Sequence, residues 1–180
     1  MEFLRRAQGI VVILLLPFLG TLRAAPPSPN EYSLKAVFLY NFCRFIDWPP
    51  AAFTSPNEPF VIGIVGPDPF GTLLDEAIAG ENYHGRPIRI AHFRNAREIR
   101  QCQLLFVSHA VGGQLNAILA AVAGRNILTV GEDDLFLDHG GMIALTAEQN
   151  RIRLRINPTA LRGTKLSVSS KLLQVADFRS

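Results

Sequence analysis

Short apolar runs recur along the chain, and segments with a helical spacing of apolar positions separate them. β-Branched and aromatic residues are consecutive in these runs, and turn residues bound them, which is typical of buried strands. We therefore expect strands at residues 60–66, 87–93, 104–107 and 126–130. The intervening segments predict helices at residues 70–79, 95–101 and 113–123. Strands that alternate with helices indicate βαβ units and a parallel sheet in an α/β fold.

The segment before the first strand predicts a helix that follows Asn30 and ends at Trp48. Asn30 is a candidate N-cap, and Glu31 and Lys35 have the i,i+4 spacing of a helical ion pair. Pro49 then stops the helix. Apolar side chains occur almost all round this helix, which favours burial against the sheet over an aromatic ligand cage. They are Leu34, Val37, Phe38, Phe42, Phe45 and Ile46.

The end of the chain has a different pattern. Residues 142–146 and 151–156 read as strands, and the polar residues 147–150 between them form a turn, so we expect a β-hairpin added to the sheet. Three arginines alternate with apolar residues along the second strand: Arg151, Arg153 and Arg155. This alternation predicts one basic face and one buried face. A final short helix is expected at 169–176. The fold class is therefore a compact single α/β domain, a mostly parallel sheet flanked by helices with a C-terminal hairpin.

Residues 1–25 have the layout of a secretory signal peptide, with a positive start, an apolar core and small residues at the end. Arg5 and Arg6 supply the charge, and Ala24 and Ala25 supply the small residues. The apolar core is about half of the roughly 20 residues that a membrane-spanning helix needs, so cleavage is favoured over a retained anchor. Residues 26–30 then form a Pro-rich leader, and residues 31–180 form the domain.

Removal of this segment changes what the composition implies. The 180 residues carry a formal charge of +3, but the signal peptide holds three arginines and one glutamate, so cleavage lowers the net charge to +1. The mature protein is then expected to be nearly neutral and exported, and export makes nucleic acid a poor partner. Its two cysteines, Cys43 and Cys102, are either one disulfide or two buried thiols.

Polar residues follow several predicted strands, at the edge of the sheet where α/β proteins bind ligands. Asp68, Ser108 and His109 form a candidate ligand rim. Glu132 also follows a strand, and Asp133 and Asp134 are expected to cap the turn after it.

The residues give no coherent catalytic motif. Ser108 and His109 are adjacent and lack a nucleophile elbow, and the four histidines share no metal-ligand spacing. Glycines around the first strand do not match a phosphate-binding loop. We therefore expect no catalytic residues, no cofactor and no metal, and a protein that is not an enzyme.

Several motifs in one order resemble the YfiR family. The opening signature is Tyr32-x-x-Lys35-Ala36-x-Phe38-Leu39-Tyr40-Asn41-Phe42, followed by Phe45, Trp48 and Pro49. Later matches are Cys102-x-Leu104-Leu105-Phe106-Val107-Ser108, Leu128-Thr129-Val130, Gly140-Gly141-Met142-Ile143, Arg151-x-Arg153-Leu154-x-Ile156-Asn157 and Leu166-Ser167-Val168-Ser169-Ser170-Lys171-Leu172-Leu173. The resemblance covers residues 31–176, nearly the whole mature chain.

The resemblance implies a periplasmic regulator with a compact α/β fold that tends to dimerise. Family members bind the periplasmic domain of an inner-membrane diguanylate cyclase and hold it inactive, and an outer-membrane lipoprotein can sequester them. Cyclic-di-GMP and biofilm formation would then be under the control of this protein. The alternative is a periplasmic small-ligand sensor that uses the rim near Asp68 and Ser108.

The chain departs from the family at informative positions. Members often carry a cysteine where Gly63 stands, able to pair with the equivalent of Cys102, and a second pair near Leu137 and Ala144. The hairpin usually has an acid where Arg155 stands.

The hairpin and the turn after it are the predicted partner surface, because they combine alternating charge with apolar neighbours. The residues concerned are Arg153, Arg155, Asn157 and Leu161.

Overall fold

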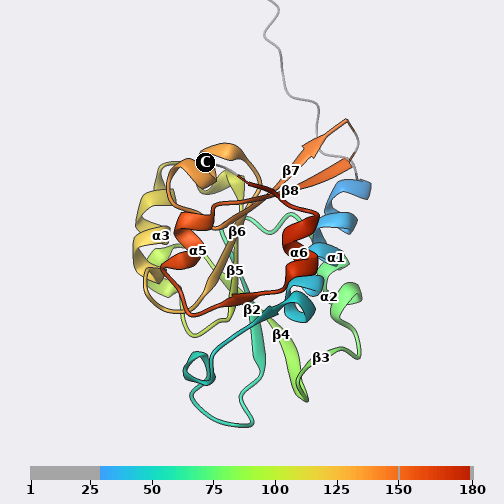
Figure 1. Ribbon diagram of the computed structural model, residues 1–180, viewed down its shortest axis with the longest axis vertical. Helices are drawn as coiled ribbons and strands as arrows, with labels where there is room; N and C mark the ends of the chain where they lie inside the picture. Colours follow the sequence, from blue (N-terminus) through green and yellow to red (C-terminus); the bar gives the residue numbers. More distant parts are fainter. Residues whose placement is uncertain (1–28, 150, 179–180) are drawn as a thin grey trace, which may run out of the picture.

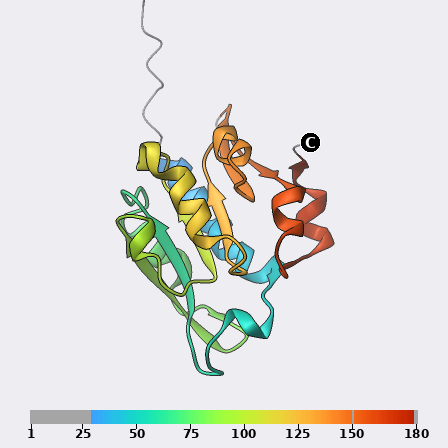
Figure 2. The same cartoon turned by 90° about the vertical axis from the view of Figure 1, so that its left-hand side faces the viewer.

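The computed structural model describes residues 29–149 and 151–178. An eight-stranded sheet in the order β10-β8-β7-β6-β5-β2-β4-β3 forms its centre, and helices cover both faces (Figure 1). Figure 2 turns the molecule so that α3 lies in front of the strands. The predicted signal peptide, residues 1–25, and residues 26–28 of the predicted leader lie outside the described residues.

Five strands form the parallel centre of the sheet and confirm the predicted α/β architecture. They are β2 (Phe60–Val65), β4 (Arg86–Phe93), β5 (Leu104–Val107), β6 (Leu128–Gly131) and β7 (Ile143–Glu148). Neighbouring strands within this group pair in parallel, with β2 between β4 and β5. Their carboxyl ends therefore meet at one edge of the sheet.

The connections between these strands include both predicted and unpredicted elements. They are α2 (Leu73–Ile78), β3 (Asn82–Tyr83), η2 (Ala96–Glu98), η3 (His109–Gln114), α3 (Leu115–Val122) and α4 (Asp134–Asp138). The helix expected at 95–101 is only the single 3-10 turn η2, which the Asn95 side chain caps. The five-residue helix α4 was not predicted as a helix, although its N-cap Asp133 was expected to cap a turn there.

The hairpin expected at the end of the chain is present. Strand β8 (Arg151–Ile156) pairs antiparallel with β7, and Ala144 faces Arg155. Strand β6 pairs only with the first two residues of β7, Ile143 and Ala144. The outer half of the hairpin therefore extends beyond β6, and Figure 1 shows it projecting from the sheet.

The remaining elements are short. They are β1 (Ile46–Asp47), η1 (Pro50–Ala52), α5 (Pro158–Arg162), β9 (Ser167–Val168), α6 (Ser170–Gln174) and β10 (Asp177–Phe178). β9 pairs with β1, and β10 pairs in parallel with β8. Helix α6 was predicted, but the two-residue strands were not, because two residues carry no periodicity.

The long helix α1 (Pro29–Phe45) covers one face of the sheet. It begins at Pro29, so Asn30 lies inside the helix and the expected N-cap is wrong. Leu39 and Phe42 are fully buried in the larger of two core clusters, as expected for a helix that packs on the sheet. Leu34 and Val37 are exposed, which corrects the expectation that the helix is buried all round.

The two cysteines lie in different core clusters. Cys43 lies on α1, in the larger cluster on one face of the sheet. Cys102 lies in the second cluster, with residues of α3, on the other face. Both are free, so the structure contains the two buried thiols and not the disulfide. Burial raises the pKa of each thiol to about 12, which suppresses the reactive thiolate.

Candidate functional site

Three consecutive acids follow β6, and each contacts a different element of the fold. They are Glu132, Asp133 and Asp134. We call them the acidic turn. Because they stand at the carboxyl end of a central parallel strand, they lie where α/β proteins place their ligand sites.

Glu132 belongs to a buried ion pair with α1. Lys35 Nζ lies 2.7 Å from Glu132 Oε1 and 2.6 Å from Glu31 Oε1. The side chain of Lys35 is 3% exposed and that of Glu132 is 6% exposed. The Tyr32 ring lies beneath the ammonium group, with 4.8 Å between Nζ and the ring centroid. The cation is thus held by two carboxylates and one aromatic face, which together offset its removal from water.

The second oxygen of Glu132 is held by η3. The His109 backbone N–H donates to Glu132 Oε2 at 3.0 Å, and His109 Nδ1 lies 3.1 Å from the same oxygen. Burial by itself would raise the pKa of Glu132, but the Lys35 ammonium and the hydrogen bonds from Lys35 and His109 lower it below its usual range. Burial, together with the Glu132 charge and hydrogen bond, raises the pKa of Tyr32 well above its usual range. Glu132 is therefore a fixed anion, and Tyr32 stays neutral.

The other two acids fasten neighbouring elements. Asp133 Oδ1 accepts the Phe136 N–H at 2.8 Å and caps α4. Arg155 Nη1 lies 2.6 Å from Asp134 Oδ2, and Arg155 Nη2 lies 2.5 Å from Glu148 Oε1. The acidic turn thus connects α1, η3, α4 and the hairpin strand β8.

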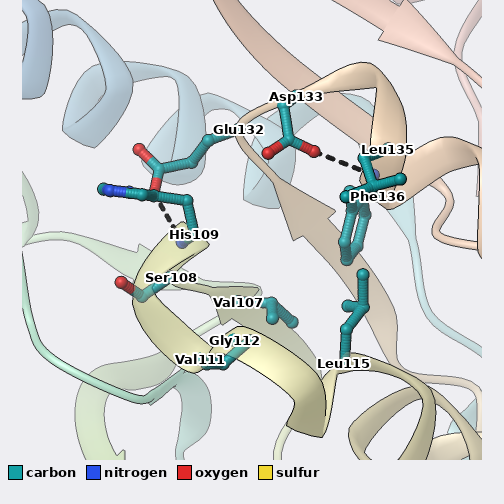
Figure 3. A pocket seen from close by; sticks show the side chains of 10 residues that line it. All are labelled: Val107, Ser108, His109, Val111, Gly112, Leu115, Glu132, Asp133, Leu135 and Phe136. Atoms are coloured by element: carbon teal, nitrogen blue, oxygen red, sulfur yellow. Dashed lines mark hydrogen bonds and ion pairs between the residues drawn. The ribbon is translucent and has the colours of Figure 1, made fainter. Parts of the chain in front are cut away.

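A cavity of about 210 Å³ opens beside the acidic turn, between η3 and α3 on one side and α4 on the other. Figure 3 shows Glu132 and His109 on one side of it, Leu115 and Phe136 on the other, and Asp133 at its rim. Its lining is largely apolar. The apolar members are Val107, Val111, Leu115, Leu135 and Phe136.

A shallower cavity of about 300 Å³ adjoins the first. The two share His109, Glu132 and Asp133 as lining residues, and the second adds Glu31, Tyr32, Lys35 and Ala147. One end of the combined site is therefore apolar and the other is charged. Among the described residues, no group of three or more side chains is placed to hold a metal ion.

The structure brings together part of the predicted ligand rim. Ser108 and His109 line the cavity, and Ser108 caps η3. Asp68 lies outside its lining, where it accepts the Phe70 N–H at 2.7 Å and lies 2.8 Å from His92 Nε2. The role of Lys35 as the partner of Glu132 was missed, although its pairing with Glu31 was predicted. The available signal was a lysine on a helix with apolar side chains almost all round, because buried lysines need a partner.

The predicted partner residues occupy different environments. Arg153 is 53% exposed and has only a distant contact with Glu148, at 4.0 Å. Arg155 is half-buried in its ion pairs, and Leu161 is half-buried. Asn157 caps α5 by accepting the Thr159 and Ala160 N–H groups at 3.1 Å. Of the polar members, Arg153 is the one that the structure leaves exposed.

Comparison with known proteins decides the family. The model of the YfiR/HmsC-like family matches residues 32–177, which is nearly all of the described chain. The chain belongs to the YfiR/HmsC-like family. YfiR/HmsC-like proteins are periplasmic and regulatory rather than catalytic, so membership implies a periplasmic regulatory role. No curated protein matches the sequence.

Solved structures share the fold of this YfiR/HmsC-like domain at low identity. A conserved domain protein from Vibrio cholerae O1 biovar El Tor matches with a TM-score of 0.56 and 11% identity over 83% of this chain. An ABC domain from Streptococcus pneumoniae, in complex with L-Trp, matches with a TM-score of 0.53 and 11% identity over 81% of this chain. This chain spans 60% and 59% of those two chains. In the described part of this chain, every helix is too short or too polar to span a bilayer.

Proposed function

We propose that this protein is a periplasmic repressor that binds the periplasmic domain of an inner-membrane diguanylate cyclase and holds it inactive. Cyclic-di-GMP and biofilm formation are then under its control. Membership of the YfiR/HmsC-like family over residues 32–177 is the observation that carries the proposal. Repression needs no chemistry, because a protein that binds the inactive conformation better shifts the population toward it.

The outer half of the β7-β8 hairpin is the best surface for this partner. It projects beyond β6 and carries the exposed side chains of Arg151 and Arg153. Exposed arginines on a projecting strand suit an acidic partner surface, since charge complementarity steers association and fixes register. Arg155 lies on the same face of β8 as Arg151 and Arg153, and its guanidinium is held by Asp134 and Glu148.

The test measures binding and repression with the periplasmic domain of the cyclase from the same organism. Arg153→Glu should weaken binding by about tenfold or more, since it places like charges across the interface. Arg89→Glu, at an exposed position on β4, is the matched control and should leave binding unchanged. A cyclase that keeps its full activity with the wild-type protein at saturating concentration would contradict the proposal. Equal binding of the two variants would contradict the assignment of the surface alone.

An outer-membrane lipoprotein that sequesters this protein would compete for the same hairpin. If both partners use it, Arg153→Glu should weaken both complexes, and the lipoprotein should displace the cyclase domain in a competition assay. Simultaneous binding of the two partners would rule out a shared surface.

A further inference from the structure

We propose that the cavity beside the acidic turn binds a small organic amine that carries an apolar group. The site is separate from the hairpin surface and stands whether or not the protein represses a cyclase. Two features carry the proposal. They are an apolar wall formed in advance and a charged rim with an excess of carboxylates.

The apolar wall is held in place by close packing. The Phe136 ring lies against Gly131 and Gly141, and a Cβ on either glycine would fall within 2.3 Å or 2.1 Å of a ring carbon. The ring is therefore held in one position, and a side chain larger than glycine at residue 131 or 141 would take up the space that it occupies. Leu115 and Val107 complete the wall, and Leu135, at 59% exposure, stands at the mouth. An apolar group that enters covers surface that water now contacts.

The rim favours a cation. The shallower cavity presents three carboxylates, those of Glu31, Glu132 and Asp133, against the single ammonium group of Lys35. Lys35 is occupied by Glu31 and Glu132, and both oxygens of Glu132 already accept hydrogen bonds.

Asp133 supplies the anion for the ligand. Its Oδ1 accepts the Phe136 N–H, and no cation among the described residues pairs with its carboxylate. Asp133 lines both cavities, so an ammonium group beside it leaves the attached apolar group directed at Phe136 and Leu115. Charge-assisted hydrogen bonds of this kind are the strong ones.

Ser108 lines the cavity, but its hydroxyl is already used to cap η3. Ser108 is 2% exposed and accepts the Ala110 N–H at 3.4 Å. The cavity suits roughly six to ten non-hydrogen atoms, since a water molecule takes about 30 Å³ of liquid volume.

The test is calorimetric titration of the purified protein with four probes. Isopentylamine and phenethylamine are compared with isopentanol and phenethyl alcohol, which have the same apolar groups without the charge. We expect each amine to bind about tenfold more tightly than its alcohol. Asp133→Asn should remove this preference while it keeps the cap of α4, because an asparagine oxygen also caps helices. Asp75→Asn, at an exposed position on α2, is the matched control and should change nothing.

A second variant examines the apolar end. Leu135→Ser, at an exposed position, should weaken isopentylamine several-fold and leave ethylamine unchanged, and amide shifts in NMR spectra should cluster at Gly112, Leu115 and Phe136. Three outcomes would each overturn the proposal. They are equal affinity for amines and alcohols, a preference for amines that persists in Asp133→Asn, and amide shifts that cluster elsewhere in the molecule. Absence of saturable binding by any probe at millimolar concentration would overturn it as well.

Discussion

Lys35 Nζ lies 2.7 Å from Glu132 Oε1, and this buried ion pair joins the first helix to the carboxyl end of the central strand β6. The two residues are 97 positions apart in the sequence. The pair fixes α1 across the sheet edge and sets the charge of the candidate ligand site. Both consequences can be measured.

Loss of Lys35 should destabilise the protein strongly. Lys35→Met keeps most of the side-chain volume but leaves Glu132 buried without its cation. We expect the free energy of unfolding to fall by about 3–5 kcal/mol, measured by urea denaturation. Lys165→Met, at an exposed lysine, should change it by less than about 0.5 kcal/mol.

The double variant Lys35→Met/Glu132→Gln distinguishes the loss of the ion pair from the cost of leaving a charged Glu132 buried without a partner. It should be more stable than Lys35→Met alone, because no uncompensated charge stays buried. A double variant that loses the sum of the two single effects would mean that Lys35 and Glu132 do not interact.

Stability should also fall in acid. The folded-state pKa of Glu132 is lowered from its ordinary value of 4.5. As pH decreases, the unfolded chain binds this proton first, so the contribution of Glu132 is fully present above about pH 4.5 and is lost as pH falls through the folded-state pKa. Urea midpoints measured between neutral pH and pH 3 should therefore decline in acid. Glu132→Gln should show a shallower decline, and an identical decline would contradict the assignment.

A cysteine at position 63 should form a disulfide with Cys102. The Cβ position at Gly63, on β2, lies 3.4 Å from the Sγ of Cys102, which stands just before the neighbouring strand β5. The closed loop would contribute about 4 kcal/mol on the chain-entropy model, less the cost of moving the Phe93 ring, which lies 2.7 Å from that Cβ position. Oxidised Gly63→Cys should melt above its reduced form, with the cross-link seen by mass spectrometry.

Gly63→Ala is the control for this variant, because it carries the same clash without the bond. It should be destabilised by about 1–3 kcal/mol in both redox states. A Gly63→Cys protein whose thiols both stay free under oxidising conditions would show that the two positions do not meet.

Substitution of Gly141 should disturb Phe136. A Cβ at Gly141 would fall 2.1 Å from the Phe136 ring, so Gly141→Ala forces the ring from its position. We expect a loss of about 1–3 kcal/mol in the free energy of unfolding. The double variant Phe136→Leu/Gly141→Ala has a smaller side chain at position 136 and should recover part of the lost free energy of unfolding. If Gly141→Ala unfolds at the wild-type temperature, the packing described for this wall is wrong.

Local patterns predicted most of the architecture. The parallel strands and the hairpin were expected because each is a run of apolar or alternating residues that its own sequence displays. Helices α4 and α5, of five residues each, were missed because so short a segment gives little periodicity. The strands β9 and β10 exist only through their pairing with distant segments.

The candidate site was predicted only in part, and for a physical reason. Ser108 and His109 could be placed at the sheet edge, since parallel strands end there. The pairing of Lys35 with Glu132 depends on how α1 crosses the sheet, which no local spacing specifies. The alternation of arginines with apolar residues along β8 predicts that Arg155 is exposed, but its ion pairs with Asp134 and Glu148 hold it half-buried.

The acidic turn has a consequence for how the cavity and the hairpin communicate. Asp133 lines the cavity and its neighbour Asp134 holds Arg155, so a single peptide bond separates the two functions. If an amine at Asp133 favours one arrangement of Asp134, it also favours the arrangement of Arg155 and the hairpin that goes with it, by the same free energy. By thermodynamic reciprocity, a partner that selects one hairpin arrangement would then change the affinity of the cavity by the same factor.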